Sequence, residues 1–596
     1  MRTRMVDYLI DRIYEAGAHH VFFVPGTGCM FLTDALARKK ELVDVSVHHE
    51  QAAGMAALTY AKLNGTLGAC VVTTGCGGTN AVTACLNAWQ DNVPCVFISG
   101  QAARNQTVRN SSVPLRQMGR QEADIIAIVD SITKYAVMIN DPSETAYVID
   151  KALFEAQNGR KGPVWIDVPL DIQNSIIDTD TLTRFTPEVE ENLSLSSADK
   201  KYLLTVLAEA KRPVILAGNG IILSGAVNEF VSFVNKIRIP VTYTRLGHDL
   251  LDAENPMHIG MVGMLGASRA GNFAVANADV VISLGTRLSI DTTSYEYEKF
   301  ARVAQIVVID IDEIEHKKNT VRIDKFIKAD AKNVLNSLLL EDIHLDIEPW
   351  REKCLHWKTT FPVCEAQYKQ GDLINMYYFT DALSDVLPDN SVVLSDAGNT
   401  FFTVSPVVRI KRSKGQRSIL SGAQAEMGYA LPAAIGASFV SDGPIIPITG
   451  DGSVMMNIQE LETMSFLQRN IKLCVMNNNG YSSIRQLQNN AFRGRLIGCD
   501  STNGCSFPAF EAIAKAFRLR YVRIEGSDNL PEKISSMLSL EGPVLCEVMC
   551  VPEQPFLGVS TGKNSKGRIV NRPIEDQAPF LDREVFASEM IIDSLD

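Results

Sequence analysis

Residues 444–478 read PIIPITGDGSVMMNIQELETMSFLQRNIKLCVMNN. A short apolar run over 444–449 ends in the turn Gly450-Asp451-Gly452, and a second over 471–476 leads into Asn477-Asn478. Both runs have the length and composition of buried strands. Between them, apolar residues recur at near-helical spacing, at Ile458, Leu461, Met464, Phe466 and Leu467. The stretch therefore predicts strand, helix and strand, with the helix over 457–469.

A right-handed crossover makes the two strands parallel, so Asp451 and Asn478 leave the same carboxyl edge of the predicted sheet. Open α/β sheets bind ligands at that edge. A carboxylate, an amide oxygen and a nearby main-chain carbonyl are hard donors that Mg²⁺ accepts, and a diphosphate supplies further oxygens. Gly452 lets the backbone approach such a diphosphate closely. Each string alone is more often an ordinary turn or loop.

Together, at this spacing and at two strand ends, the strings resemble the diphosphate and metal motif of thiamin-diphosphate (ThDP) enzymes. The resemblance implies Asp451, Asn478 and the main-chain carbonyl of Gly480 as metal ligands. It also implies cofactor contacts at Gly450, Gly452 and Ser453.

With 596 residues, the chain is too long for one hydrophobic core, and serial βαβ patterns predict an α/β fold. We expect three doubly wound parallel-sheet domains. Under the resemblance these are a pyrimidine-binding domain (1–175), a central FAD-binding-like domain (190–345), a diphosphate- and Mg-binding domain (376–555) and a tail (556–596). The first and third segments look like two versions of one architecture. A polar linker is expected over 189–200, and an irregular connection over 350–375.

The bulk composition is that of a soluble globular protein, with 46% hydrophobic and 21% charged residues. A formal charge of −12 argues against nucleic acid as a partner. The N-terminal segment predicts an amphipathic helix rather than a signal peptide, and the uncharged stretch 63–90 contains too many Gly, Thr and Asn for a membrane span. Twelve cysteines without a CxxC pair favour a reducing cytoplasm.

In the first segment, the string VSVHHEQAAGMAA places Glu50 where a short strand meets a helix. A glutamate in a first helical turn is most often a partner of the helix dipole. The following TTGCGGTN, with Asn80, resembles the pyrimidine-binding domain of ThDP enzymes. By that resemblance Glu50 hydrogen-bonds N1′ of the aminopyrimidine and Asn80 lies at the cofactor, while Gly26 and Gln121 line the catalytic cleft.

In SGAQAEMGYALPAAIGAS, Met427 matches the bulky apolar residue over which the ThDP cofactor bends. The carbonyl of Ala425 would then accept a hydrogen bond from the 4′-amino group. A methionine near a helix start is usually a core residue. Gln424 and Glu426 depart from the family pattern and place polar side chains beside the expected site. They are either substrate contacts or ordinary surface residues.

Within the ThDP class, the chain resembles the acetohydroxyacid (acetolactate) synthase-like group up to about residue 550. The string QEADIIAIVDSITKY resembles the segment that follows that group's active-site loop, and Gln121 matches the group's glutamine. Arg120 stands in place of the usual Phe before that glutamine. The middle segment resembles the group's FAD-binding domain, which implies flavin contacts at Arg287, Asp312 and Asp330. Similar strand ends occur without flavin, so FAD stays a possible cofactor. Gly218 and Gly220 form only a fragment of a dinucleotide fingerprint.

Leu487 stands where the synthases carry a Trp that narrows the acceptor pocket, so either the acceptor is larger than pyruvate or Leu487 is ordinary packing. The C-terminal run from 555 resembles synthase-like proteins of polysaccharide and branched-sugar synthesis, which implies a keto-sugar nucleotide acceptor. Lys563, Lys566 and Arg568 would meet its diphosphate, or belong to a solvated tail.

The implied function is a ThDP- and Mg²⁺-dependent carboligase. It decarboxylates a 2-oxoacid such as pyruvate and transfers the two-carbon unit to a carbonyl acceptor, in a homodimer or homotetramer with active sites between subunits. Two enzymatic alternatives are a simple 2-oxoacid decarboxylase and a flavin-dependent pyruvate oxidase. A catalytically silent regulator ranks last, because Glu50 and Asp451 are both present.

Overall fold

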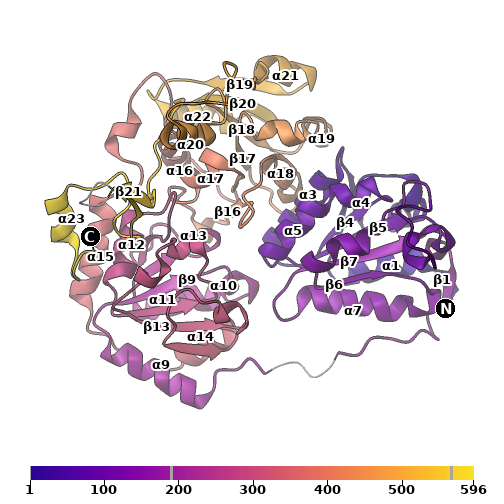
Figure 1. Cartoon of the computed structure of the whole chain (residues 1–596), viewed down its shortest axis with the longest axis horizontal. Helices are drawn as coiled ribbons and strands as arrows, with labels where there is room; N and C mark the ends of the chain where they lie inside the picture. Colours follow the sequence, from indigo (N-terminus) through magenta and orange to yellow (C-terminus); the bar gives the residue numbers. More distant parts are fainter. Residues whose placement is uncertain (1, 188–191, 564–567, 596) are drawn as a thin grey trace.

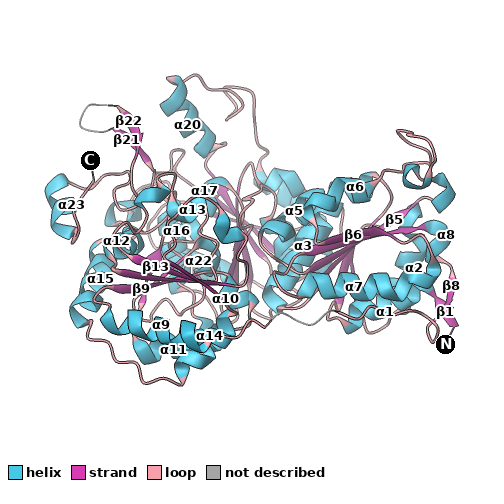
Figure 2. Cartoon of the chain, turned by 60° about the horizontal axis from the view of Figure 1, so that its bottom comes forward, coloured by secondary structure: helices cyan, strands magenta, loops and turns pink. Residues whose placement is uncertain are grey.

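The computed structural model describes residues 2–187, 192–563 and 568–595. The chain forms three α/β domains, each built on a six-stranded parallel sheet, as predicted. Helices cover both faces of each sheet (Figures 1 and 2). Part of the expected linker (residues 189–191) and Lys566 lie outside the described residues.

The first domain has the strand order β3-β2-β4-β5-β7-β6. One face is covered by α1, α2 and α7, and the other by α3, α5 and α6 (Figure 2). The strands are β2 (His20–Phe23), β3 (Val43–Ser46), β4 (Gly68–Val72), β5 (Cys95–Gln101), β6 (Tyr135–Met138) and β7 (Pro163–Pro169). The main helices are α1 (Met5–Glu15), α2 (Met30–Arg38), α3 (Glu50–Asn64), α5 (Val82–Gln90), α6 (Ile125–Val129) and α7 (Thr145–Gln157).

The third domain repeats this topology, with the order β16-β15-β17-β18-β20-β19. Its strands are β15 (Val392–Ser395), β16 (Arg417–Leu420), β17 (Ile445–Gly450), β18 (Lys472–Asn477), β19 (Arg520–Ile524) and β20 (Val544–Met549). Its helices include α16 (Met376–Asp385), α17 (Gly398–Val404), α18 (Ala430–Ala437), α19 (Glu460–Leu467), α20 (Ser482–Phe492), α21 (Phe510–Ala516) and α22 (Leu530–Leu538). When the strands are numbered within each domain, the first and third sheets both have the order 2-1-3-4-6-5. The expectation that these two segments are versions of one architecture is therefore confirmed at the level of topology.

The middle domain has a different order, β11-β10-β9-β12-β13-β14, which is 3-2-1-4-5-6 within the domain. Its strands are β9 (Pro213–Ala217), β10 (Val241–Tyr243), β11 (His258–Met261), β12 (Val280–Leu284), β13 (Gln305–Asp310) and β14 (Lys325–Lys328). Its helices include α9 (Ser197–Glu209), α10 (Gly220–Leu223), α11 (Val227–Ile237), α12 (Arg269–Asn277) and α14 (Ala331–Leu339). The order reverses between β9 and β12, which creates a switch point at their carboxyl ends.

The first and third domains meet through two alanine-rich helices, α3 and α18, which share one hydrophobic core. Gly436 makes the close approach possible, because a Cβ there would lie 2.2 Å from the main-chain oxygen of Ala56. The hydroxyls of Thr59 and Tyr429 lie 2.7 Å apart across this contact. The contact places the N-terminus of α3, where Glu50 lies, beside the third domain.

Four local expectations need correction, two in the third domain and its connection and two at the chain's ends. The helix predicted over 457–469 is shorter, since a 3₁₀ turn (Val454–Asn457) precedes α19, and Phe466 is 82% exposed. The irregular connection over 350–375 contains helix α15 (Glu348–Thr360), which buries Trp350, Cys354 and Trp357 along one face. That face packs on the middle domain, so the helix depends on a long-range contact.

The N-terminal helix begins at Met5, because residues 2–4 form strand β1 (Arg2–Arg4), which pairs with β8 (Ile176–Asp178). The described tail forms a hairpin of β21 (Thr561–Lys563) and β22 (Ile569–Asn571) and helix α23 (Arg583–Glu589). Ile574 and Phe586 join the middle-domain core, so this part is not a solvated tail (Figure 1). Among the described residues, no helix combines the length and apolar character needed to cross a bilayer.

Candidate active site

Glu50 begins helix α3 directly after the His49 N-cap, whose ring nitrogen accepts from the Gln51 amide. Its carboxylate is buried and accepts a 2.9 Å hydrogen bond from the Asn80 side chain. Asn80 ends α4 (Cys76–Asn80) and is itself exposed. The structure therefore joins the two predicted residues at a place where the first domain opens to its surface.

The turn 73–77 after β4 gathers the other predicted residues of this domain. A Cβ on Gly26 would lie 2.4 Å from the Thr73 hydroxyl, and one on Gly77 would lie 3.3 Å from a Glu50 carboxylate oxygen. A Cβ on Gly75 would lie 1.8 Å from the main-chain oxygen of Gln121. Gln121 has a left-handed φ of 60°. Gly26, Glu50 and Gln121 thus surround one turn at the carboxyl edge of the first sheet.

In the third domain, Asp451 directly follows β17, and its two carboxylate oxygens accept from the amides of Gly452 (2.8 Å) and Gly480 (2.9 Å). The side chain is 2% exposed, and this burial raises the pKa of Asp451 to about 6 although the amide bonds lower it. The βαβ unit therefore brings the two quoted strings together, as the parallel register of β17 and β18 requires.

The side chain of Asn478 has the properties expected of a cation ligand. Its side chain is 5% exposed, and its Oδ1 is buried without a hydrogen-bond partner. A buried amide oxygen left unpaired costs about 1–3 kcal/mol, which a bound cation would remove. Asp451, the Asn478 amide and the Gly480 carbonyl together form a hard-oxygen donor set of the kind Mg²⁺ takes, so these residues fit the group.

The glycines of the turn have different surroundings. A Cβ on Gly450 would meet nothing within 4 Å, so open space adjoins the backbone there. A Cβ on Gly452 would lie 2.3 Å from the Tyr481 ring, so Gly452 is needed for that packing in this structure. The Ser453 hydroxyl donates to Asp396 (2.7 Å) and accepts from the Gly428 amide (2.9 Å). Ser453 thus links the turn to the segment that precedes α18.

Asn399 is a candidate that the sequence reasoning missed. It lies in the first turn of α17, after the carboxyl end of β15, the strand next to β17. Both polar atoms of its amide are buried without a partner. The signal was available, because SDAGNT follows a buried strand in the same way that GDG follows β17. Its amide therefore has unpartnered hydrogen-bonding groups at the sheet edge where Asp451 lies.

The segment from Gln424 to Met427 lies between the domains. Ala425 has a left-handed φ of 47°, an uncommon conformation for a residue with a Cβ. Met427 is 38% exposed, so it is not a core residue. Glu426 accepts from Asn87 of helix α5, so it contacts the first domain rather than lying free on the surface. Burial raises the pKa of Glu426 to about 7, and Gln424 buries an unpartnered side-chain oxygen.

A cavity of about 620 Å³ opens at the switch point of the middle sheet. Its walls include Gly220 after β9, Gly285 after β12 and Asp310 at the end of β13. It extends to Phe401 and Ala425 of the third domain. Its volume lies in the range of small-molecule sites, and its place is the one at which doubly wound sheets bind nucleotides.

The three predicted flavin contacts all line this cavity. Arg287 is exposed there. Asp312 pairs with Arg160 of the first domain (2.7 Å), and Asp330 caps helix α14 by accepting from the Lys332 amide (2.9 Å). The structure thus brings Arg287, Asp312 and Asp330 together, with the two carboxylates engaged in local contacts. A nucleotide fits the volume and the position of the cavity.

Leu487 on α20 is 56% exposed, so within this chain it is not ordinary core packing. Arg120 is exposed as well. Helix α20 stands out from the rest of the third domain (Figure 2). Arg568 is already engaged in a contact.

The predicted site residues of the first domain and those of the third domain bond within their own domains. The Glu50 carboxylate bonds Asn80 of its own domain, and Asp451 bonds amides of the third domain. Where the domains meet, the main-chain amide of His48 donates to the Glu460 carboxylate (3.0 Å), and the side-chain amide of Asn457 donates to the Gln51 side chain (3.0 Å). The neighbours of Glu50 in the chain therefore face α19 and the turn before it.

Three family models match the chain. They are described as the N-terminal TPP binding domain of thiamine pyrophosphate enzymes (residues 3–128), the central domain (201–338) and the C-terminal TPP binding domain (396–548).

Proteins similar to this chain over most of its length are described as acetolactate synthases. The probable acetolactate synthase large subunit of Methanocaldococcus jannaschii is 33% identical over 94% of this chain and 94% of its own length. The acetolactate synthase large subunit of Cyanidium caldarium is 30% identical over 94% and 95%. The chloroplastic acetolactate synthase 1 of Oryza sativa is 31% identical over 92% and 84%.

Proposed function

Because this chain belongs to the thiamin-diphosphate-dependent enzymes and is acetolactate synthase-like, we propose that it decarboxylates a 2-oxoacid and transfers the two-carbon unit to a carbonyl acceptor. Pyruvate is the proposed donor. The observation that carries the proposal is the pair of polar loops after β17 and β18, which the Gly480 amide and the Asp451 carboxylate join and in which the buried Asn478 Oδ1 has no hydrogen-bond partner.

In this proposal Asp451, Asn478 and the Gly480 carbonyl hold Mg²⁺. Gly450, beside open space, and the buried amide of Asn399 receive the diphosphate together with Gly452 and Ser453. Bound ThDP supplies the electron sink for decarboxylation and carboligation.

Glu50 holds the proton at N1′ of the aminopyrimidine, with Asn80 fixing its carboxylate. The Ala425 carbonyl would accept a hydrogen bond from the 4′-amino group, and Met427 would pack against the cofactor and keep its reacting groups close together. Gly26 and Gln121 line the cleft and exclude water.

FAD is the proposed occupant of the cavity in the middle domain. Its support is the 3-2-1-4-5-6 strand order, the position at the switch point, and the carboxylates after β13, which suit ribose hydroxyls. Arg287 would meet the diphosphate, and Asp312 and Asp330 the remaining polar groups. The visible spectrum of the purified protein tests this proposal, because bound flavin absorbs where apoprotein does not.

The acceptor proposed is larger than pyruvate, a keto-sugar nucleotide. The exposed Leu487 leaves room where the synthases place an indole, and the exposed Arg120 offers a cation to an anionic substrate.

The proposed enzyme is cytoplasmic and assembles as a homodimer or homotetramer whose subunits share active sites. The domain bounds 1–175, 190–345 and 376–555, with a tail over 556–596, form part of the proposal.

The test is incubation of the protein with pyruvate, ThDP and Mg²⁺ against a panel of keto acids and keto-sugar nucleotides, followed by mass spectrometry. A product two carbons heavier than one acceptor supports the proposal. Release of free aldehyde regardless of acceptor would identify a 2-oxoacid decarboxylase. Rapid bleaching of flavin on anaerobic addition of pyruvate would identify a pyruvate oxidase. Absence of CO₂ release from every 2-oxoacid would leave only the silent regulator.

A further inference from the structure

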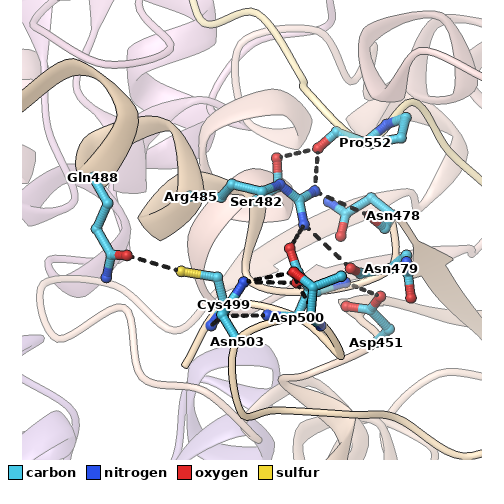
Figure 3. A network of polar contacts seen from close by, with 12 residues as sticks. Asp451, Asn478, Asn479, Ser482, Arg485, Gln488, Cys499, Asp500, Asn503 and Pro552 are labelled. Carbon is cyan, nitrogen blue, oxygen red and sulfur yellow. Dashed lines mark hydrogen bonds and ion pairs between the residues drawn. The ribbon is translucent and has the colours of Figure 1, made fainter. Parts of the chain in front are cut away.

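A buried arginine lies beside the proposed cation site and has none of the roles assigned above. Arg485, in the first turn of α20, is 7% exposed. Among the described residues, its guanidinium bonds to groups outside its own helix (Figure 3): the main-chain oxygens of Asn478 (3.3 Å), Asn479 (3.2 Å) and Pro552 (2.7 Å) and the Asp500 carboxylate (3.1 Å). It therefore connects α20 to the loop that carries two proposed metal ligands.

The loop from Asn478 to Gly480 has a specific backbone shape. Asn479 has a left-handed φ of 57° and Gly480 a φ of 134°. Asparagine and glycine are the residue types that adopt such conformations most readily, so the sequence permits this shape and contacts with neighbouring segments select it. The guanidinium of Arg485 supplies hydrogen bonds to two successive carbonyls of this loop.

A second segment, which contains Cys499 and Asp500, packs against the Asn478–Gly480 loop. The carbonyl of Cys499 accepts from the Tyr481 amide (2.8 Å), and a Cβ on Gly480 would lie 2.3 Å from that carbonyl. The next residue is Asp500, whose other oxygen accepts from the Thr502 amide (3.0 Å) and the Asn503 side chain (2.7 Å). Asp500 is thus fixed independently of Arg485 and can orient the guanidinium.

The Arg485 contacts bear on two proposed metal ligands. Arg485 donates to the main-chain carbonyls of Asn478 and Asn479, while the buried side-chain oxygen of Asn478 has no hydrogen-bond partner among the described residues. The Gly480 amide of the same loop donates to Asp451. One arginine therefore fixes the backbone of the loop that carries the unpartnered Asn478 amide oxygen and that bonds to the Asp451 carboxylate.

We propose that Arg485, oriented by Asp500, is a positioning residue that holds the Asn478–Gly480 loop in its cation-binding shape. The inference rests on the proposed function, because the cation is the Mg²⁺ that would anchor ThDP. Ordinary packing of α20 is the competing role, and it predicts loss of stability without a change in cation affinity.

The test uses the full-length protein and calorimetric titration of Mg²⁺ at fixed ThDP, with melting temperatures of the cofactor-free variants. For Arg485→Gln we expect Mg²⁺ affinity to fall about tenfold or more, equivalent to about 1.4 kcal/mol. At saturating Mg²⁺, kcat should return to the wild-type value. Asp500→Asn should weaken Mg²⁺ binding in the same direction. Arg495→Gln, an exposed arginine in the loop after α20, is the control and should leave affinity unchanged.

An Mg²⁺ affinity within twofold of wild type in Arg485→Gln overturns the proposal, whatever its melting temperature. Should that variant not fold, Asp500→Asn decides by the same criterion. Failure of the wild-type protein to bind ThDP with Mg²⁺ at all would instead refute the proposed function, so the two failures are distinguishable.

Discussion

In the first turn of α3, the Glu50 carboxylate is buried yet bonded to an exposed Asn80. Replacing it with Gln keeps the shape and one oxygen acceptor but removes the group that can exchange a proton with N1′. We expect Glu50→Gln to slow the C2–H/D exchange of bound ThDP by about 10²-fold or more, the usual scale of general acid–base catalysis. NMR of quenched samples measures the exchange.

The cofactor affinity of Glu50→Gln should stay close to that of the wild type, because Asp451 and Asn478 are untouched. Glu41→Gln, an exposed position in the same domain, serves as the control. Exchange at the wild-type rate in Glu50→Gln would remove this carboxylate from the mechanism.

Glu426 makes the stability depend on pH. Burial raises its pKa from 4.5 to about 7, so the folded chain keeps a proton that the unfolded chain releases. Its contribution is therefore fully present below about pH 4.5 and is lost as the pH rises through 7. We expect Glu426→Gln to gain about 3 kcal/mol relative to wild type at pH 8 and little at pH 4.

Urea unfolding at both pH values, without ThDP, measures this difference. The neighbouring charges of Lys62 and Asp91 are unchanged in the variant, and Glu511→Gln on the exposed face of α21 is the control. A stability difference that is the same at pH 4 and pH 8 would show that Glu426 does not titrate in this range.

Two elements, α3 and α18, set the contact between the first and third domains. Gly436→Ala adds a Cβ that would lie 2.2 Å from the Ala56 carbonyl, a backbone atom that cannot move aside cheaply. We expect a loss of about 1–3 kcal/mol from overpacking, only partly offset by the better helix propensity of alanine. Urea unfolding measures the loss, with Ala516→Ser on the exposed face of α21 as control. Unchanged stability would mean that the helices can separate freely.

Helix α15 and the C-terminal segment show why some elements escape local patterns. Trp350, Cys354 and Trp357 bury one face of α15, and Glu589 of α23 accepts from the Trp357 indole (2.9 Å). The Trp357–Glu589 contact joins residues 232 positions apart, and Trp350 reaches Pro213 across 137 positions. A polar, charged helix of this kind is stabilised by its packing rather than by propensity.

At the scale of the whole molecule, we propose that Glu50 of one subunit and Asp451 of another bind the same ThDP molecule. Glu50→Gln and Asp451→Asn should each be inactive as pure dimers. When the two are co-expressed, a mixed dimer contains one site with both residues intact. Random pairing then restores about a quarter of wild-type activity, since about half of the dimers are mixed.

Differently tagged subunits allow the mixed dimer to be purified, and sedimentation gives its mass. Activity no higher than that of either pure variant would place Glu50 and Asp451 in one subunit and contradict a shared site.

Local patterns predicted much of this protein because their signals extend over tens of residues. The apolar runs of residues 444–478 and the glycine turn were enough to predict a βαβ unit and the edge at which Asp451 and Asn478 meet. Glu50, Gly26 and Gln121 required the family resemblance, and the fold brings them around one turn.

The tertiary structure determined the remaining features, namely the partners of Arg485 and the cavity beside Arg287. Arg485 reaches main-chain carbonyls, which every residue possesses, so no side-chain pattern marks its partners. The cavity beside Arg287 is lined by residues of three domains, among them Arg160 of the first and Ala425 of the third. Such features depend on contacts between distant segments, and local periodicity carries no record of them.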